Sequence, residues 1–453
     1  MKKLIVLLVS VLFGASLFAG NKDETPFLTS SFPAASINAL EASTSVGSIT
    51  VNGNAGSEAV VDMYVSFNNT VERLRNRSNE DFFQILQDDY TVDISVKNGK
   101  LYAVAKPKNN NKNVLSISFK IRAPKQVNGY MQTSVGSIHI ADLSGTQGFK
   151  TGSGSMTIEN VTGKISGTTA VGSITVTNSK NVIDLKTGSG SITANNCSGE
   201  VTLITSVGAI RLNELDGNIN VTTGSGKLIV ENVSGKIIGS TSVGAINVTN
   251  AKDNIDLKTG SGSITAKGCK GDIKFRTSVG AIRLDDINGD INITTGSGAL
   301  TVDNVSGKIT GSTSVGAITV TNSNDYIDLK TNSGSVTASN INGVFKTETS
   351  VGGVNLTGIS GSVEAKTSSG GMTVEMQSVS DFVKLSNSGN GTLNLTLPAG
   401  KGYNLKVNAI MDIKTHELKD FSGKVDSKNL VGTLGNGGAE IDVKAYKVNL
   451  TFK

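Results

Sequence analysis

The repeat that decides the fold is clearest between Thr187 and Gly208, which read TGSGSITANNCSGEVTLITSVG. The motif T-S-V-G or a close variant such as T-G-S-G ends on a glycine every eighteen residues from Gly136 to Gly370, in fourteen copies without insertion or deletion. A threonine stands three residues before each of these glycines, from Thr133 to Thr367. A fixed period of this length predicts a solenoid, in which each repeat forms one coil and buries its apolar side chains by stacking on its neighbours.

A finer period of nine residues lies within each coil. Apolar residues separated by one polar residue recur at this spacing, as at Ile183 and Leu185 and again at Ile192 and Ala194. This alternation is strand geometry, with both apolar side chains on one face. The polar residues between the pairs supply the positive φ that tight turns need. We therefore predict an all-β chain that forms a parallel β-solenoid with at least two short strands in each eighteen-residue coil.

Other repeat architectures fit the sequence less well. A left-handed hexapeptide helix needs apolar residues every six positions, and a calcium-binding β-roll needs an aspartate in each nonapeptide loop, where this chain has Thr-Gly-Ser-Gly. An antiparallel meander of nine-residue units explains the unbroken threonine column less well. No proline occurs between Pro124 and Pro398, as expected where a proline would remove a hydrogen bond between coils.

The two ends of the chain differ from the repeat, and they set the predicted domain boundaries. Residues 1–20 carry two lysines, an apolar run and then small residues, which is the pattern of a signal peptide. We expect an N-terminal cap over residues 21–131, the regular solenoid over residues 132–385, and strands that cap its other end over residues 386–453. No later segment is apolar enough to predict a membrane anchor.

The N-terminal cap is predicted to be a small α+β region. It holds one isolated copy of the motif, Thr44–Val51, before the pattern departs. Ser78, followed by Asn-Glu-Asp and then apolar residues, predicts a capped short helix. Alternating apolar residues on both sides of Asn98-Gly99 predict a β-hairpin.

The composition argues against several classes of function. The chain has 42 Lys and Arg, 37 Asp and Glu, 53 Gly, five Pro and no Trp, which is unusual for a globular enzyme and usual for a solenoid of short strands and turns. Its net charge of +5 at pH 7 is too small to favour a nucleic acid partner, and it has no basic block. The cysteines, Cys197 and Cys269, stand four coils apart, so we predict that each is a small buried hydrophobe rather than half of a disulfide.

With T-S-V-G-S-I and T-G-S-G-S-I in view, the chain resembles a bacterial family of putative adhesins with β-strand repeats. It is also similar to the head domains of putative autotransporter adhesins. The matching stretches include Gly152–Met156, Gly188–Ile192, Gly260–Ile264 and the late Gly437–Ile441. The resemblance covers nearly the whole mature chain and implies a single-stranded right-handed β-helix. It implies no catalytic residues.

Few residues are candidates for chemistry. Asp285 and Asp303 stand eighteen residues apart, so they should stack on adjacent coils with Asp286 beside them, as a candidate cation site, although a solvated acidic spot explains them as well. His139 and His416 fit no catalytic or metal-binding spacing. Asn160, Asn178, Asn196 and later asparagines share one column, which predicts a structural amide ladder. We predict that the chain binds no cofactor and is not an enzyme, because no long loop extends from the coils to form the wall of an active-site cleft.

The sequence thus predicts an exported, non-catalytic, adhesin-like solenoid at the cell surface or outside the cell. Its repeated polar surface would bind a glycan or a surface protein through many weak contacts. Alanine at one outward Thr or Asn should then barely change binding. The alternatives are a periplasmic envelope scaffold or stress-sensing module and, with less support, a glycan-active β-helix enzyme.

Overall fold

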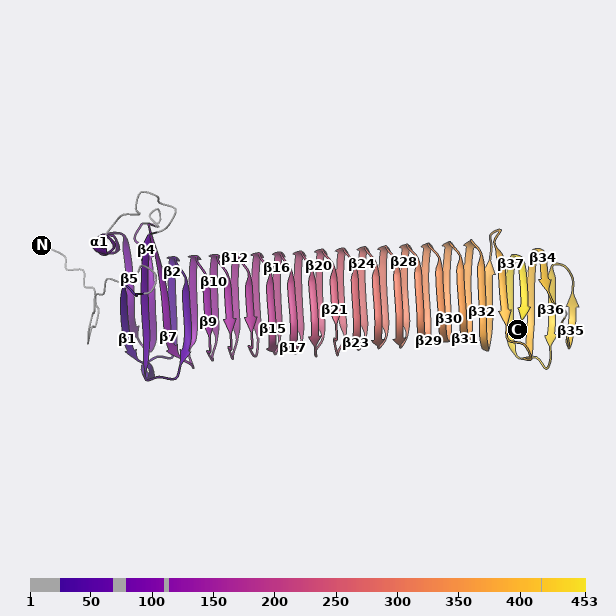
Figure 1. The fold of residues 1–453 in the computed structure, drawn as a ribbon, viewed down its shortest axis with the longest axis horizontal. Helices are drawn as coiled ribbons and strands as arrows, with labels where there is room; N and C mark the ends of the chain where they lie inside the picture. Colours follow the sequence, from indigo (N-terminus) through magenta and orange to yellow (C-terminus); the bar gives the residue numbers. More distant parts are fainter. Residues whose placement is uncertain (1–24, 68–78, 110–113, 417) are drawn as a thin grey trace. The chain divides into compact units, whose positions relative to one another are not determined.

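The computed structural model describes residues 25–67, 79–109, 114–416 and 418–453. The chain divides into an N-terminal unit that ends at Ser225 and a C-terminal unit that begins at Gly226. In both units, parallel strands stack in coils of about 18 residues, so the predicted β-solenoid is confirmed (Figure 1). The signal peptide predicted at residues 1–20 lies outside the described residues.

Each complete coil of the N-terminal unit has two principal sides, each formed by a strand. Strand β14 pairs in parallel with β12 and β16 on one side, and β15 pairs with β13 and β17 on the other. The elements are η1 (Ala34–Ser36), α1 (Asn79–Asp89) and the strands β1 (Leu28–Pro33), β2 (Ala39–Val46), β3 (Ile49–Asn54), β4 (Glu58–Phe67), β5 (Tyr90–Lys97), β6 (Lys100–Pro107), β7 (Leu115–Pro124), β8 (Asn128–Val135), β9 (Ile138–Ala141), β10 (Gln147–Ser153), β11 (Met156–Glu159), β12 (Ile165–Val171), β13 (Ile174–Thr177), β14 (Ile183–Ser189), β15 (Ile192–Ser198), β16 (Val201–Val207), β17 (Ile210–Asp216) and β18 (Ile219–Ser225).

The coil register follows from the sequence period. Ile183 lies beside Ile165 and Val201, and Ile192 lies beside Ile174 and Ile210, each pair eighteen residues apart. These side chains are fully buried and form ladders through the core. Backbone hydrogen bonds between coils and apolar burial inside them therefore depend on the same period.

Positive φ angles turn the chain at the corners of each coil. Gly190 has a φ of +155°, and a Cβ there would lie 2.2 Å from the carbonyl oxygen of Gly172. Asn196 has a φ of +49°, a left-handed conformation that asparagine tolerates better than most residues. The turn residues predicted from the sequence are therefore required by the backbone.

The isolated motif copy belongs to the stack rather than standing apart from it. Its strands β2 and β3 pair in parallel with β8 and β9, which places Thr44 beside Thr133 and Ile49 beside Ile138. On their other side β2 pairs with β6 and β3 pairs with β7. The residues between the motif copy and the regular repeat thus return to build further layers of the same solenoid.

Antiparallel strands and the helix finish the N-terminal end. Strand β4 pairs antiparallel with β7 and with β1, and β5 pairs antiparallel with β6 around the predicted Asn98-Gly99 turn. Helix α1 is present as predicted, although its proposed cap Ser78 lies outside the described residues. Phe82 of α1 is buried and stacks on Phe67 of β4 with 4.4 Å between ring centroids. The helix therefore contributes to the core at this end.

The C-terminal unit is built from coils of the same kind and ends in a more complex arrangement of strands. Its strands are β19 (Leu228–Val233), β20 (Ile237–Val243), β21 (Ile246–Thr249), β22 (Ile255–Ser261), β23 (Ile264–Lys270), β24 (Ile273–Val279), β25 (Ile282–Asn288), β26 (Ile291–Ser297), β27 (Leu300–Ser306), β28 (Ile309–Val315), β29 (Ile318–Ser333), β30 (Val336–Val351), β31 (Val354–Ser369), β32 (Met372–Asn387), β33 (Thr392–Leu397), β34 (Tyr403–Thr415), β35 (Phe421–Val425), β36 (Asn429–Leu434) and β37 (Ala439–Phe452). The last strand, β37, lies between β32 and β33 on one side and β34 on the other. The antiparallel strands β36 and β35 follow β34.

Within the described residues, no helix is both long enough and apolar enough to cross a membrane.

Candidate binding surfaces of the coils

The unbroken threonine column is buried. Its members from Thr44 to Thr367 expose between 1% and 5% of their surface. From Thr151 onward, each hydroxyl donates a hydrogen bond to the carbonyl oxygen of the corner glycine fifteen residues earlier, at 2.9–3.1 Å. This column joins adjacent coils and is not available to a partner.

The asparagine column forms the structural ladder that the sequence predicts. The side-chain amide of Asn178 donates to the side-chain oxygen of Asn160, and that of Asn196 donates to Asn178, at 3.1 and 2.7 Å. In the C-terminal unit, Asn250 donates to Asn232 in the same way. Because these residues also hold the left-handed corner, their role is to fix the turn.

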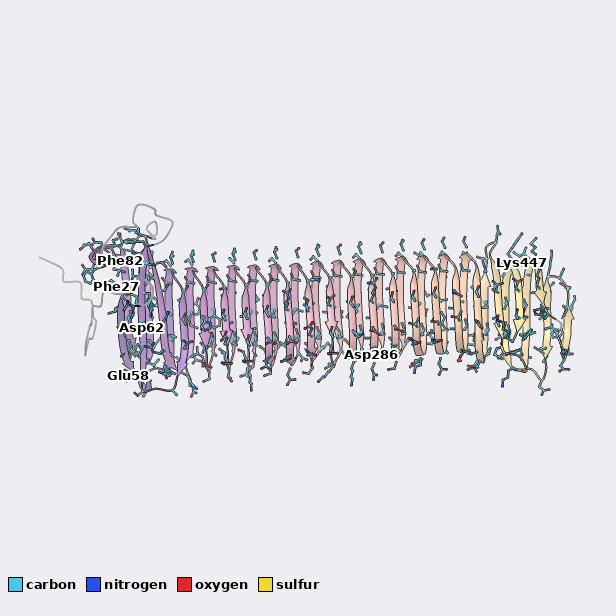
Figure 2. All side chains as sticks on the ribbon, in the orientation of Figure 1. Phe27, Glu58, Asp62, Phe82, Asp286 and Lys447 are labelled. Atoms are coloured by element: carbon cyan, nitrogen blue, oxygen red, sulfur yellow. The ribbon has the colours of Figure 1, made fainter. Side chains whose placement is uncertain are left out.

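The three aspartates proposed as a cation site already have donors from the chain. Asp285 and Asp303 lie side by side in the register of β25 and β27, as predicted. Lys267 forms an ion pair with Asp285 at 2.7 Å, and the side chains of Thr321 and Asn322 donate to Asp303. Asp286 lies at a corner (Figure 2), where Asn304 donates to its carboxylate at 3.3 Å. In the part of the chain that the structure describes, no group of three or more His, Cys, Asp or Glu residues could hold a metal ion.

The remaining candidates are placed simply. His139 is half-buried on β9, and His416 is exposed after β34. Cys197 and Cys269 are free and buried, so their predicted inward position is confirmed. Burial raises the pKa of both thiols, so each stays protonated.

The structure also shows a corner surface that the sequence analysis missed. In every second coil the valine of T-S-V-G is exposed: Val135, Val171 and Val207 by 50–55%, and Val243, Val279, Val315 and Val351 by 55–57%. The intervening coils have serine at this position. Each corner spans four residues, from two before the glycine to one after it. Across the fourteen copies, Lys227 is the one charged residue at these positions. The corner is thus nearly free of charge and carries regularly spaced methyl groups.

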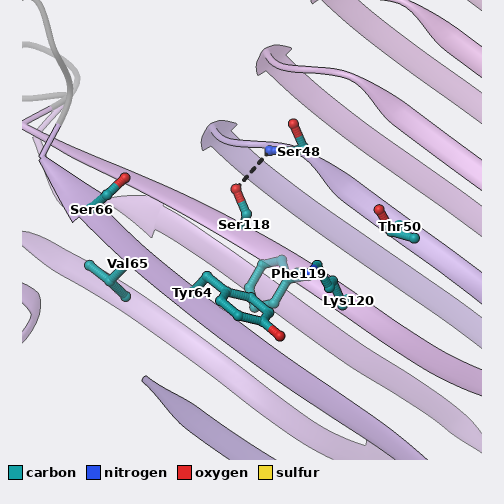
Figure 3. A pocket seen from close by; sticks show the side chains of 8 residues that line it. All are labelled: Ser48, Thr50, Tyr64, Val65, Ser66, Ser118, Phe119 and Lys120. Atoms are coloured by element: carbon teal, nitrogen blue, oxygen red, sulfur yellow. Dashed lines mark hydrogen bonds between the residues drawn. The ribbon is translucent and has the colours of Figure 1, made fainter. Parts of the chain in front are cut away.

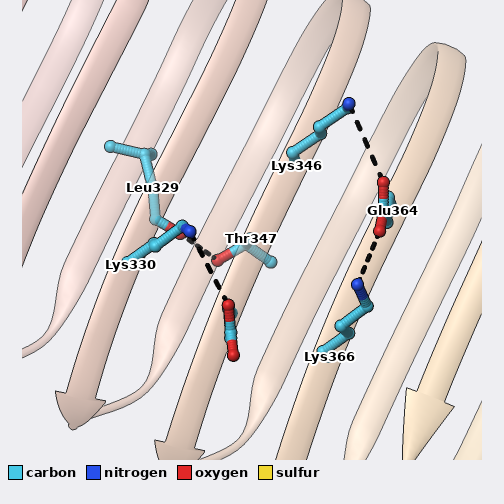
Figure 4. Close-up of polar contacts among 7 residues, drawn as sticks. Leu329, Lys330, Lys346, Thr347, Glu364 and Lys366 are labelled. Carbon is cyan, nitrogen blue, oxygen red and sulfur yellow. Dashed lines mark hydrogen bonds and ion pairs between the residues drawn. The ribbon is translucent and has the colours of Figure 1, made fainter.

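In the C-terminal unit, the side of the coils that β28 forms carries ion pairs on its outer surface, both between neighbouring strands and within β31. Lys366 and Lys346 lie 2.7 and 3.8 Å from the carboxylate of Glu364, and Lys330 lies 3.8 Å from Glu348 (Figure 4). The hydrogen bond from Lys366 lowers the pKa of Glu364. Exposed pairs of this kind contribute about 1 kcal/mol or less each.

This lowered pKa predicts a small pH effect. Glu364 should stabilise the fold fully above the ordinary glutamate pKa of about 4.3, and this contribution should be lost as the pH falls through the lower folded pKa. Glu364→Gln should therefore lose measurably less stability than the wild type on acidification, by a difference of up to about 1 kcal/mol. Urea unfolding at neutral and acidic pH checks this. An equal acid sensitivity of the variant and the wild type would contradict it.

The other side of the coils, formed by strands such as β15 and β27, presents outward threonine and asparagine side chains in register. In the C-terminal unit they form one row across β27, β29, β30, β31, β32, β33 and β37, which we call the threonine–asparagine row: Thr301, Thr319, Thr337, Asn355, Thr373, Asn394 and Asn449. All seven are exposed or half-buried. Arg283 precedes the row and Lys414 follows it in the register. The row therefore offers hydroxyls and amides between two cations.

A similar but shorter row lies in the N-terminal unit. Thr50, His139, Thr157, Thr175 and Thr193 follow one another across β3, β9, β11, β13 and β15. Lys120 and Arg211 stand at its two ends. Asparagines and a histidine are interspersed with the threonines in these two rows, so the rows do not stand out as a threonine repeat in the sequence.

No protein-family model and no curated protein matches the chain. Among solved structures, a putative lipid binding protein from Parabacteroides distasonis ATCC 8503 is 15% identical, covering 74% of this chain and 98% of its own, with a TM-score of 0.18. A putative cell adhesion protein from Clostridium sporogenes ATCC 15579 is 10% identical, covering 57% of this chain and 98% of its own, with a TM-score of 0.16. At these TM-scores neither likeness bears on what this chain binds.

Proposed function

We propose that this protein is an exported, non-catalytic, adhesin-like solenoid that binds a glycan or a surface protein through repeated polar contacts. The observation that supports the proposal is the threonine–asparagine row, which repeats one hydrogen-bonding position on successive strands. A ligand that itself repeats can contact several of these positions at once. Each contact is weak, and their sum gives the affinity.

Hydroxyl and amide groups suit such a ligand because they both donate and accept hydrogen bonds. Thr301, Thr319 and Thr337 of the row are half-buried and hold their hydroxyls on a regular strand surface. A rigid surface loses little conformational entropy when a ligand binds, which favours binding by many weak contacts.

The first experiment asks where the protein lies. Antibodies against the mature chain should label intact cells as strongly as permeabilised cells. Protease treatment is a poorer test, because a tight solenoid resists cleavage in any compartment. Labelling only after permeabilisation would contradict the adhesin proposal and favour the periplasmic scaffold.

The second experiment tests multivalency. Thr319→Ala should change binding to cells or to a glycan surface by less than about twofold, because one of many contacts is lost. Deleting Ala281–Gly352, four coils that keep the register, should weaken binding at least about tenfold. Thr294→Ala, which removes an exposed threonine on the other side of the coil, is the matched control. If Thr319→Ala abolished binding, one residue would carry the affinity and the multivalent mechanism would be wrong.

A further inference from the structure

A separate cleft lies on the outer surface of the N-terminal unit, where β3, β4 and β7 run side by side. Its volume is about 260 Å³. The residues that line it are Ser48, Thr50, Tyr64, Val65, Ser66, Ser118, Phe119 and Lys120. Hydroxyl groups, one phenol ring and one cation thus meet on a surface of three strands.

Lys120 is held in place without a carboxylate partner. Its ammonium lies 4.7 Å from the centre of the Tyr64 ring, a cation–π contact that restricts the long side chain. Among the described residues, no Asp or Glu lies within ion-pair distance of it. The positive charge of Lys120 is therefore available to an anion that enters the cleft.

The nearest carboxylate in the register is already paired with other groups. Asp62 lies opposite Lys120 on β4. Its two oxygens accept from Thr29 at 2.7 Å and pair with Arg122 at 3.2 Å, and the residue is 7% exposed. The buried carboxylate of Asp62 therefore lies near two cations, Lys120 and Arg122, so this part of the surface has an excess of positive charge.

Hydroxyl groups surround this charge. Ser48, Thr50, Ser66 and Ser118 present their side chains around Tyr64 and Lys120 (Figure 3). The Ser118 hydroxyl accepts a hydrogen bond from the backbone N–H of Ser48 and keeps its own proton to donate. A ligand with both a carboxylate and several hydroxyls would satisfy the cation and these groups together.

We propose that this cleft binds a sugar acid, the carboxylate-bearing residue of an acidic polysaccharide. The carboxylate pairs with the Lys120 ammonium, and the sugar hydroxyls bond to Ser48, Thr50, Ser66 and Ser118. Tyr64 is a positioning residue that holds the ammonium over its ring. This is a single site in one unit, and it does not rest on the multivalent function proposed above.

The test uses the full mature chain and isothermal titration calorimetry with an oligogalacturonate, compared with a neutral cello-oligosaccharide of the same length. The wild type should bind the acidic oligosaccharide more tightly. Lys120→Gln should weaken that binding at least about tenfold, because a charge-assisted hydrogen bond is lost. Tyr64→Leu should weaken it by a smaller factor. Lys150→Gln, on the exposed surface of β10, is the matched control and should leave binding unchanged.

Several results would overturn the proposal. Equal binding of acidic and neutral oligosaccharides, or no binding of either, would do so. Unchanged binding by Lys120→Gln, or an equal loss in Lys150→Gln, would show that the cleft is not the site. Full displacement by inorganic phosphate at the same concentration would show that the hydroxyls add nothing. A far-UV circular dichroism spectrum of each variant confirms that it is folded.

Discussion

Gly370→Ala should lower the stability of the fold by at least about 3 kcal/mol, whereas Gly371→Ala, one residue later, should change it by less than about 1 kcal/mol. Gly370 is a corner glycine with a φ of +139°, and a Cβ there would lie 2.4 Å from the carbonyl oxygen of Gly352 on the preceding coil. At Gly371 the nearest atom to a new Cβ is 3.7 Å away, an ordinary contact. The midpoint of urea unfolding, followed by far-UV circular dichroism, measures both changes.

The paired design separates two explanations for a loss of stability. Both variants add one methyl group to the same turn, so a general intolerance of alanine at the turn would affect them equally. The clash at Gly370 involves backbone atoms, which cannot move aside as a flexible side chain could. Similar midpoints for the two variants would contradict the close approach of the two coils at this corner.

The coil register is the part of the fold that the sequence predicts best. Glycine and asparagine recur where the backbone needs positive φ, and apolar pairs recur where strands face the core, so the period alone places Ile183 beside Val201. Each of these local requirements points to the same eighteen-residue coil. The handedness of the coil, which the family resemblance implies, stays a prediction.

The direction of individual side chains at the corner could not be predicted from alternation. Thr205 and Val207 are two residues apart, and on a straight strand both would face the same side. The chain turns before Gly208, so Thr205 is buried and Val207 is 55% exposed. The more apolar residue of the pair therefore faces solvent, whereas periodicity alone would place it in the core.

The eighteen-residue repeat also could not predict contacts between segments that lie far apart in the sequence. The isolated motif copy pairs with the first regular coil across 89 residues, from Thr44 to Thr133. The cleft joins Tyr64 of β4 to Lys120 of β7, two strands that pair antiparallel although a helix and a hairpin separate them in the sequence. Both residues lie outside the copies of the eighteen-residue motif, so the repeat gave no signal for this site.

Thr277→Val should lower the stability of the fold by about 1–2 kcal/mol, although it replaces a buried polar residue with an apolar one of similar shape. The Thr277 hydroxyl donates to the carbonyl oxygen of Gly262 at 3.0 Å, and the residue is 5% exposed. Valine removes the donor and leaves that carbonyl oxygen without it. The loss of the hydrogen bond should exceed the gain from burying one more methyl group.

The reverse exchange in the same tetrapeptide is the control. Val279→Thr places a hydroxyl where the side chain is 55% exposed, so the free energy of unfolding measured in urea should change by less than about 0.5 kcal/mol. Because both changes exchange the same two side-chain types, their difference depends only on which residue faces the core. If Thr277→Val were neutral and Val279→Thr destabilising, the hydroxyl column would not hold the coils together, and the valine of T-S-V-G would have to lie inside.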